Sequence, residues 1–322
     1  MIFVDYRSMA RHYKFMLSHD HHKTGVIIVE EEERLFPNSF IYFLYKIHYS
    51  RINSIVNLPL KSLWYNYLIP NNIDKTKQYC FILSPSIIIS YGDAFVKYLR
   101  SKYQCKIVLV IGDKISTYSK SFDVNALKRS LDLVCTYNPV DSKKYNILLH
   151  PGVVYNLQVE NIKPFVEREN DVFFIGQEKG RGDQISEIYN KCKSIGLKCD
   201  FNIVGETIFP HVDGIHYSNW IPFEDVFERM KNAKSIINIL QPGASGITQR
   251  DSEAYSLGCY LITNNKSEEL NRIFNDEQVI NIEDIKKEVA ESIQSRAEAF
   301  TKRENKYTLD GFYNWIEQTL QS

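Results

Sequence analysis

A chain of 322 residues is long enough for two domains, and its 44% hydrophobic and 24% charged residues are typical of a globular protein. Lysine plus arginine and aspartate plus glutamate both number 39, so no net charge favours nucleic acid as a partner. No run of eighteen apolar residues occurs, which argues against a membrane-spanning helix, and the early charges at Asp5 and Arg7 argue against a signal peptide.

The charge is nevertheless uneven along the chain. Residues 1–165 carry 21 basic and 13 acidic side chains, a balance of +8, whereas residues 166–322 carry 18 and 26, a balance of −8. Basic clusters, for example Lys97, Arg100 and Lys102, would suit an anionic partner such as a membrane surface, although solvated lysine is the commoner explanation. We therefore expect at most a peripheral contact with the inner face of the membrane.

The cysteines and histidines show no disulfide or metal pattern. None of the six cysteines belongs to a CxxC motif, and most lie in or beside apolar runs, where a reduced thiol acts as a small hydrophobe. Four histidines cluster near the start without the regular spacing of a metal site, namely His12, His19, His21 and His22. We expect a cytoplasmic protein with reduced cysteines, no metal and no bound cofactor.

The first half of the sequence alternates strand and helix patterns. The predicted strands are Ile2–Asp5, Gly25–Val29, Tyr79–Leu83, Lys106–Ile111 and Leu131–Thr136. Helical patterns fall near Asn38–Ser50, Leu60–Leu68, Asp93–Tyr103 and Asn125–Ser130. Such alternation predicts an α/β domain over residues 1–155, with a parallel sheet between two layers of helices.

Ligands of open parallel sheets bind beyond the carboxyl ends of the strands. Asp113 follows such a strand end and is our candidate general base; the alternative is that it caps the turn after Gly112. Asp20, between two histidines, is the second candidate, and Asp141 is interpreted as a helix cap. No GxGxxG motif occurs at these strand ends, so the phosphate loop of a dinucleotide-binding site is missing.

The regular pattern breaks between Asn146 and Asn170, which we interpret as a linker between domains. A second alternation, over residues 171–305, predicts another parallel-sheet domain. Its strands are expected at Val172–Ile175, Asp200–Val204, Gly214–Tyr217, Ile236–Leu240, Cys259–Ile262 and Gln278–Ile282. Helices are expected at Gln184–Ile195, Phe223–Asn232, Ile247–Leu257, Ser267–Phe274, Asp284–Phe300 and Leu309–Leu320.

The stretch from Ser235 to Asn265 reads as a strand–loop–helix–strand unit whose glycine-rich loop leads into a helix. The open N–H groups and the positive dipole end of a helix N-terminus suit a phosphate. Arg250 lies in the first turn, where a cation is favourable only beneath an anion, and Glu253 can accept the two hydroxyl donors of a ribose. The alternative is an ordinary strand-to-helix turn with Arg250 and Glu253 as a surface ion pair.

A second glycine-rich loop begins where the first strand of this domain ends. It contains Gly176, Lys179 and Arg181, and two cationic loops in one domain would hold a diphosphate from two sides. Trp220 and Ile221, after a later strand, would place an aromatic ring beside a base. A tryptophan buried in the core is the alternative.

The order of these motifs resembles the C-terminal nucleotide-sugar domain of GT-B glycosyltransferases. The resemblance is carried by FFIG with the following KGR loop, Val204-Gly205, HYSNWIPFEDVFERMKNAK and QPGASGITQRDSEAYSLGCYLITNN. It is similar to the pattern of bacterial lipopolysaccharide and capsule biosynthesis transferases, and it covers residues 171–265. The resemblance implies a GT-B fold: two Rossmann-like parallel-sheet domains face a cleft, and a C-terminal helix, residues 306–322, returns to the N-terminal domain.

The resemblance also implies roles for individual residues. Glu253 matches the carboxylate that binds the donor ribose. The implied phosphate contacts are Gly176, Lys179, Arg181, Gly246, Ile247, Thr248 and Arg250; base contacts are Trp220 and Ile221; Gln241 and Ser245 lie in the donor-sugar region. Ser245 is a departure, because many retaining members have a second glutamate there, so the stereochemistry of transfer does not follow.

These features predict a glycosyltransferase that moves a sugar from a nucleotide-diphosphate-sugar co-substrate to a cell-surface polysaccharide or lipid-linked glycan. Cationic side chains and helix N–H groups, rather than a metal, would stabilise the leaving diphosphate, and the sequence contains no Asp-x-Asp. The alternatives are a GT-B-type sugar epimerase or phosphopolyol transferase, and a catalytically silent nucleotide- or glycan-binding partner.

Overall fold

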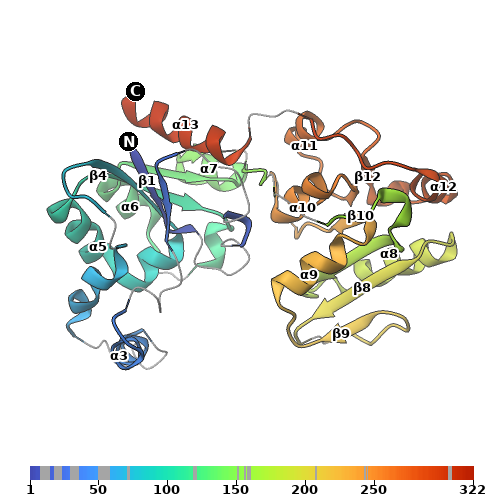
Figure 1. The fold of residues 1–322 in the computed structure, drawn as a ribbon, viewed down its shortest axis with the longest axis horizontal. Helices are drawn as coiled ribbons and strands as arrows, with labels where there is room; N and C mark the ends of the chain where they lie inside the picture. The colour runs from blue at the N-terminus through green and yellow to red at the C-terminus, as the bar shows by residue number, and fades with distance from the viewer. Residues whose placement is uncertain are drawn as a thin grey trace. The chain divides into compact units, whose positions relative to one another are not determined.

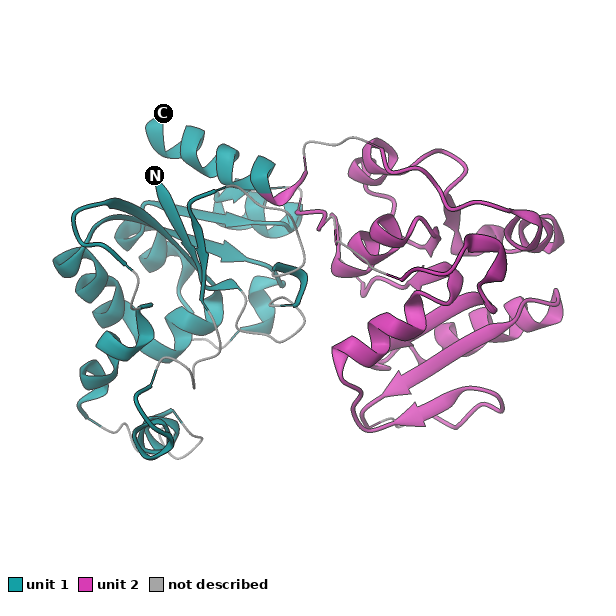
Figure 2. Cartoon of the chain, in the orientation of Figure 1, with its two compact units in different colours: residues 1–18, 22–150, 310–322 teal, residues 19–21, 151–309 magenta. Residues whose placement is uncertain are grey.

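The computed structural model describes residues 1–7, 15–17, 24–29, 36–49, 59–70, 73–118, 122–150, 152–155, 157, 161–206, 209–242, 244, 246–303 and 307–322. The chain forms two compact units (Figure 2). The first consists of residues 1–18, 22–150 and 310–322, and the second of residues 19–21 and 151–309. Each unit contains a six-stranded sheet in which all the paired strands are parallel, so the predicted α/β class with two parallel-sheet domains is confirmed.

The sheet of the first unit has the strand order β2-β1-β3-β4-β5-β6 (Figure 1). The strands are β1 (Ile2–Asp5), β2 (Val26–Ile28), β3 (Gln78–Leu83), β4 (Gln104–Ile111), β5 (Leu133–Thr136) and β6 (Leu148–Leu149). The helices are α3 (Ser39–His48), α5 (Pro85–Lys102), α6 (Val124–Ser130), α7 (Pro139–Tyr145) and α13 (Leu309–Gln321), with the 3-10 helices η2 (Lys61–Leu68) and η3 (Ile115–Thr117). The strand order reverses between β1 and β3, because the chain adds β2 on one side of β1 and the later strands on the other.

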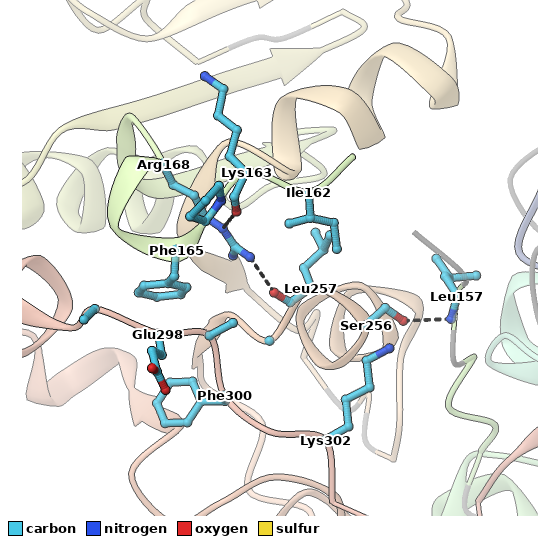
Figure 3. A pocket seen from close by; sticks show the side chains of 14 residues that line it. Leu157, Ile162, Lys163, Phe165, Arg168, Ser256, Leu257, Glu298, Phe300 and Lys302 are labelled. Carbon is cyan, nitrogen blue, oxygen red and sulfur yellow. Dashed lines mark hydrogen bonds between the residues drawn. The ribbon is translucent and has the colours of Figure 1, made fainter. Parts of the chain in front are cut away.

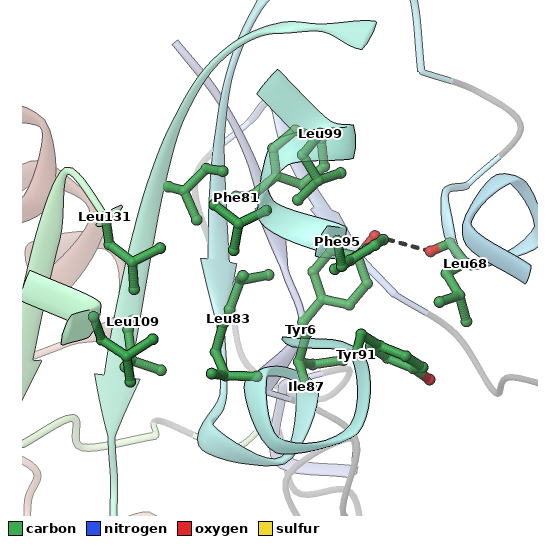
Figure 4. Close-up of a cluster of buried hydrophobic side chains, with 14 of the residues drawn as sticks. Tyr6, Leu68, Phe81, Leu83, Ile87, Tyr91, Phe95, Leu99, Leu109 and Leu131 are labelled. Atoms are coloured by element: carbon green, nitrogen blue, oxygen red, sulfur yellow. Dashed lines mark hydrogen bonds between the residues drawn. The ribbon is translucent and has the colours of Figure 1, made fainter. Parts of the chain in front are cut away.

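Aromatic and aliphatic side chains fill the core between this sheet and its helices (Figure 4). The central strand β3 is apolar and buried from Tyr79 to Leu83, as expected of a parallel strand covered on both faces. The buried ring of Tyr6 still satisfies its hydroxyl, which donates a hydrogen bond of 2.9 Å to the carbonyl oxygen of Leu68. Burial raises the pKa of Tyr6, so this hydroxyl remains a donor.

The C-terminal helix α13 packs against the carboxyl end of β1 within the first unit. The buried carboxylate of Asp5 pairs with Arg7 at 2.5 Å and accepts a hydrogen bond of 2.9 Å from the Tyr313 hydroxyl. The Arg7 guanidinium also lies 4.4 Å from the centre of the Phe312 ring, which is a cation–π distance. These contacts tie α13 to a strand that lies 308 positions earlier in the sequence.

The sheet of the second unit has the order β12-β11-β10-β7-β8-β9. The strands are β7 (Asn170–Gly176), β8 (Cys199–Val204), β9 (His216–Ser218), β10 (Ala233–Asn238), β11 (Tyr260–Thr263) and β12 (Val279–Asn281). The helices are α8 (Gly182–Ser194), α9 (Phe223–Met230), α10 (Gln249–Leu257), α11 (Glu268–Ile273) and α12 (Lys287–Ser295). The order reverses between β7 and β10, and the carboxyl ends of such a strand pair are where doubly wound sheets bind ligands.

Two helix predictions in the first unit need correction. The segment expected to form a helix near Leu60–Leu68 is a 3-10 helix. The helix expected at Asp93–Tyr103 is the second half of α5, which begins at Pro85 and is interrupted by Gly92 with a non-helical φ of 66°. Proline at the first position fixes the start of this helix, and glycine tolerates the interruption because it has no Cβ.

The prediction that Asp141 caps a helix was also wrong. Asn138 is the cap of α7, because its side chain accepts hydrogen bonds from the N–H groups of Val140 and Asp141. The carboxylate of Asp141 is buried and instead accepts a bond of 2.8 Å from the N–H of Ile115. A local pattern identified a polar residue near a helix start, but the tertiary contact decided its role.

Candidate functional site

Helix α10 begins directly beyond the carboxyl end of β10 with a capping box. The side chain of Thr248 accepts the N–H of Asp251, and the Asp251 carboxylate accepts the N–H of Thr248 at 2.8 Å. Within the described part of the chain, the backbone N–H groups of Gln249 and Arg250 donate to no acceptor. Two N–H groups at the positive end of the helix dipole are therefore open to an anion.

A buried hydrogen-bond network fixes this helix start. Asp251 is fully buried and accepts a bond of 2.7 Å from the Asn238 amide at the end of β10, and Asn265 bonds to the same carboxylate. Burial raises the pKa of Asp251 to about 6, although hydrogen bonds from Thr248, Asn238 and Asn265 act in the opposite direction. The network joins the first turn of α10 to the ends of two neighbouring strands.

The loop before α10 is held in place through its backbone. Gly246 has a left-handed φ of 82°, its N–H donates to the Ser267 hydroxyl at 2.8 Å, and its carbonyl accepts from Asn265 at 2.9 Å. Ile247 is buried, and a Cβ placed on Gly152 would lie 2.7 Å from the Cβ of Ile247. Gly246 therefore shapes the loop, and the Ile247 side chain faces the protein interior.

Arg250 and Glu253 form a buried ion pair. Their side chains meet at 2.5 Å, with Glu253 fully buried and the Arg250 side chain 21% exposed. Glu253 also accepts a bond of 2.9 Å from Gln249, and Arg250 donates to the carbonyl of Ile175 at the end of β7 at 2.9 Å. Burial raises the pKa of Glu253, and the charge of Arg250 opposes that rise. The alternative of a surface ion pair is therefore wrong, and both carboxylate oxygens are engaged.

Arg181 is a second cation held over strand ends. Its guanidinium donates to the carbonyl of Gln177 at 2.7 Å, to that of Glu178 at 3.3 Å, and to that of Ile239 beyond β10. Desolvation lowers the pKa of Arg181 and the charge of Glu178 raises it, but an arginine stays protonated under such conditions. Lys179 is exposed in the same turn, with a φ of 47°. No carboxylate of the described chain lies within ion-pair distance of Arg181 or Lys179.

These contacts bring several of the predicted phosphate residues together at the carboxyl ends of β7 and β10. We call this region the cationic edge. Arg250 is anchored to the Ile175 carbonyl near the end of β7, Arg181 to carbonyls just beyond β7 and β10, and the open N-terminus of α10 follows β10. Gly176 is the last residue of β7 and is half-buried beside them. The edge combines two arginines and two open N–H groups, which is an arrangement suited to a phosphate or diphosphate.

Trp220 and Ile221 follow the edge strand β9. Trp220 is 62% exposed and Ile221 is half-buried, so the alternative of a tryptophan in the core is wrong. Because β9 is separated from β7 by β8, these residues lie about 10 Å along the sheet from the cationic edge. Gln241 is exposed just after β10, and Ser245 lies outside the described residues.

Asp113 is exposed in the first unit, just beyond the carboxyl end of β4. It accepts no hydrogen bond from the described residues, and the N–H of Ile115 donates to Asp141 instead. The alternative that Asp113 caps the turn after Gly112 is therefore wrong. Asp20, the other candidate base, lies outside the described residues, as do the four clustered histidines.

Four polar residues of this edge were missed by the sequence reading: Asn238, Asp251, Asn265 and Ser267. The Thr-x-x-Asp spacing of residues 248–251 is a capping-box pattern and would have revealed Asp251. The other three share only a position at or shortly after the end of a strand, and their convergence depends on the pairing of β10 with β11.

The described residues contain no group of three or more His, Cys, Asp or Glu side chains suited to a metal ion. No helix in the described ranges is both long and apolar enough to cross a membrane. All six cysteines are free thiols.

A cavity of about 460 Å³ lies at the opposite end of α10 (Figure 3). Leu257 and Gly258 at the end of the helix line it, together with Phe165 and Phe300. The nine residues of α10 place it about 14 Å from the helix start. A helix C-terminus presents carbonyl oxygens, and Arg168 already donates to that of Leu257 at 2.9 Å. The cavity is therefore distinct from the cationic edge.

No curated protein matches the chain. Among solved structures, it is similar to an alpha1,3-fucosyltransferase with GDP, at 11% identity over 79% of this chain and 85% of that chain, with a TM-score of 0.37. It is similar to T4 phage BGT in complex with its UDP-glucose substrate, at 16% identity over 70% and 75% of the two chains, with a TM-score of 0.43. A third similar structure is an alpha-glucosyltransferase in complex with UDP-glucose and DNA containing an abasic site, at 12% identity over 99% and 89%, with a TM-score of 0.46.

A family model described as glycosyl transferase-like matches residues 186–310. The match runs from within α8 to the start of α13, and it includes Arg250 and Glu253 but not Arg181. Over this segment, the second unit is similar to glycosyl transferase-like proteins.

Proposed function

We propose that the protein is a GT-B glycosyltransferase that takes its sugar from a nucleotide-diphosphate-sugar donor. The observation that carries this proposal is the convergence of Arg181, Arg250 and the open start of α10 at the carboxyl ends of β7 and β10. A diphosphate would supply the negative charge and the acceptor oxygens that suit these donors. The glycosyl transferase-like match over residues 186–310 supports the same assignment.

In glycosyl transfer, the bond between the anomeric carbon and the diphosphate breaks, and the acceptor hydroxyl forms the new bond. Negative charge grows on the leaving diphosphate as this happens. Fixed cations and helix N–H groups stabilise such charge without having to reorganise. The proposal gives this role to Lys179, Arg181, Arg250 and the N–H groups of α10, without a metal or a cofactor.

Glu253 is proposed to bind the donor ribose, which requires one of its present partners to leave. Gln249 is the easier partner to displace, because it is neutral, half-buried and bound through a single bond of 2.9 Å. Arg250 would stay, since it also holds the Ile175 carbonyl. The two ribose hydroxyls would then replace the Gln249 amide on the carboxylate.

The remaining roles follow the sequence-based predictions. Trp220 and Ile221 are proposed to contact the base, and Gln241 and Ser245 the donor sugar. Asp113 of the first unit is proposed as the general base for the acceptor hydroxyl, since it is an exposed carboxylate without a hydrogen-bond donor among the described residues. The acceptor is proposed to be a cell-surface polysaccharide or lipid-linked glycan, reached from the cytoplasm through peripheral membrane contact; nucleic acid is not proposed as a partner.

Calorimetry with UDP-, GDP-, CMP- and dTDP-sugars tests the donor site. We expect at least one of them to bind, and Arg181→Gln to weaken binding about 10- to 100-fold, the range for a hydrogen bond to a charged group. Lys193→Gln is the matched control, because Lys193 is exposed near the far end of α8. The proposal fails if none of the donors binds, or if both variants bind the donor equally well.

Release of free nucleotide from the donor tests whether the site is catalytic. We expect slow donor hydrolysis without an acceptor, and faster turnover with an acceptor glycan. A catalytically silent binding partner would bind the nucleotide sugar and release nothing. An epimerase would change the sugar while leaving it attached to the nucleotide.

A further inference from the structure

Helix α3 and the 3-10 helix η2 expose an unusual number of large apolar side chains. Among the described residues, eleven large hydrophobic side chains are exposed, and five of them belong to these two elements or their ends. They are Phe40 at 67%, Phe43 at 59%, Ile47 at 37%, Leu60 at 65% and Leu63 at 58%. We call these five residues the apolar patch. Gathered exposure of this kind marks an interaction surface, whereas single exposed hydrophobic residues do not.

The apolar patch is built on a firmly anchored helix. Phe40, Phe43 and Ile47 recur at positions i, i+3 and i+7 of α3, so they form one stripe along it. Tyr45 lies on the opposite side of the helix and is buried, with its ring 5.9 Å from that of Trp64 in η2. Because the inward face already packs on the core, the exposed stripe is not needed to hold the helix in place.

The two elements of the patch also contact one another. The ring of His48, at the end of α3, lies 2.9 Å from the carbonyl of Pro59, just before η2. Leu60 follows in the left-handed region with a φ of 68°, a strained conformation for a leucine, and its side chain is 65% exposed. Figure 1 shows α3 at the end of the first unit, away from the labelled strands.

The composition of the sequence that carries the patch indicates the chemistry of its partner. From Arg34 to Ile73 the sequence contains no acidic residue, although acidic residues number 39 in the whole chain. The same 40 residues contain nine aromatic side chains and four cations, of which Lys46 and Lys61 lie in the described helices. Exposed Phe, Leu and Ile side chains accompanied by lysines, without acidic residues in the same stretch, are typical of protein surfaces that enter the interface of an anionic bilayer.

A second copy of the chain fits this surface less well. A two-fold dimer would place the same patch on both sides of the interface, so Lys46 and Lys61 of the two copies would come together. No acidic residue in this stretch would neutralise them. An anionic lipid surface instead offers complementary charge to the lysines and an apolar layer to the phenylalanines and leucines.

We propose that the apolar patch of α3 and η2 docks the protein on anionic lipid bilayers. The proposal deepens the peripheral membrane contact of the proposed function, and it moves that contact away from the basic cluster at Lys97, Arg100 and Lys102. Arg100 of that cluster is already paired with Asp132 at 2.8 Å. The patch inserts its phenylalanines and leucines among the lipids, while Lys46 and Lys61 contact the headgroups.

Vesicle flotation of the full chain tests this docking surface. We expect binding to phosphatidylcholine vesicles that contain about one third phosphatidylglycerol, and weaker binding to phosphatidylcholine alone. The Phe40→Ser/Phe43→Ser variant should lose at least about tenfold in affinity, since burial of each phenylalanine side chain is favourable. Val140→Ser is the matched control, because Val140 is 63% exposed on α7 of the same unit and should bind as the unaltered chain does.

Two further measurements test whether the lysines contribute to vesicle binding and whether the variants remain folded. Lys46→Gln/Lys61→Gln should weaken binding at low salt and have little effect at high salt, because salt screens exposed charges. Circular dichroism should show equal unfolding for all variants, as expected of substitutions at exposed positions. Equal vesicle binding by the phenylalanine variant, or no binding of the unaltered chain at low salt, would overturn the proposal.

Light scattering tests the rival occupant. If the unaltered chain is a dimer and the Phe40→Ser/Phe43→Ser variant is a monomer, the patch binds a second copy of the chain and the proposal is overturned. Calorimetry with the nucleotide sugar keeps this test separate from the donor site. Patch variants that bind the nucleotide sugar normally but no longer bind vesicles would support the docking proposal. Loss of nucleotide-sugar binding in Arg181→Gln, by contrast, concerns only the proposed donor site.

Discussion

Replacing Glu253 by alanine tests the buried ion pair at the centre of the candidate donor site. The Glu253 side chain is fully buried and is bound by Arg250 at 2.5 Å and by Gln249 at 2.9 Å. Alanine would leave the Arg250 guanidinium, whose side chain is only 21% exposed, without its counter-ion. Breaking a buried ion pair costs about 3–5 kcal/mol, and the partial exposure of Arg250 reduces our expectation to about 2–4 kcal/mol.

Urea unfolding followed by circular dichroism measures this loss. Glu187→Ala is the control, because Glu187 is exposed on α8, and it should change the free energy of unfolding by no more than about 0.5 kcal/mol. Adding Arg250→Met to Glu253→Ala should recover part of the loss, since no unpaired charge then remains buried. Equal unfolding midpoints for Glu253→Ala and Glu187→Ala would refute the reasoning.

The same variant also tests the ribose assignment. At a temperature where Glu253→Ala is folded, calorimetry should show nucleotide-sugar binding weakened by about 1.5–3 kcal/mol, the contribution of hydrogen bonds to a charged group. Unchanged affinity in the folded variant would remove Glu253 from the donor site while leaving its structural role intact.

Three further predictions concern other parts of the chain. Because burial raises the pKa of Asp251 to about 6, the folded state binds the carboxyl proton more tightly than the unfolded chain does. The free energy of unfolding should therefore fall by up to about 3 kcal/mol as the pH rises from about 4 to 6. The urea midpoints of Asp251→Asn should lack this dependence. Asp113→Asn should leave donor affinity intact in calorimetry and lower transfer about 10²- to 10⁴-fold in a turnover assay; full turnover would remove Asp113 from the mechanism. Tyr313→Phe removes the hydrogen bond to the buried Asp5 and should cost about 1–3 kcal/mol in urea unfolding; an unchanged midpoint would contradict that anchoring role.

The fold was predictable because its signals are local. The apolar runs that became β3 and β4 are buried on both faces, so nearly every residue of each run had to be apolar. The helix start at Thr248 and its end at Gly258 were similarly marked, by a capping residue and by a glycine with a φ of 59°. The errors arose where local preference was weak, as in η2, where a 3-10 helix replaced the expected α-helix.

The candidate site was predictable only in outline. The strand–loop–helix pattern identified Arg250 and Glu253 as neighbours on one helix face, because they are three residues apart. It did not reveal that Glu253 is fully buried, or that Arg250 reaches the carbonyl of Ile175, 75 positions earlier. Both facts depend on β7 pairing with β10, which no local pattern specifies.

The sequence by itself determined the alternation of strands and helices, the two parallel sheets and the position of the glycine-rich loops. Those features follow from side-chain periodicity and backbone preference, which act over a few residues. The tertiary structure alone decided that Asp141 supports η3, and that Asp251 and Asn265 fix the start of α10. Each of these depends on groups that are distant in sequence and meet only because buried polar atoms must find partners once the sheets have formed.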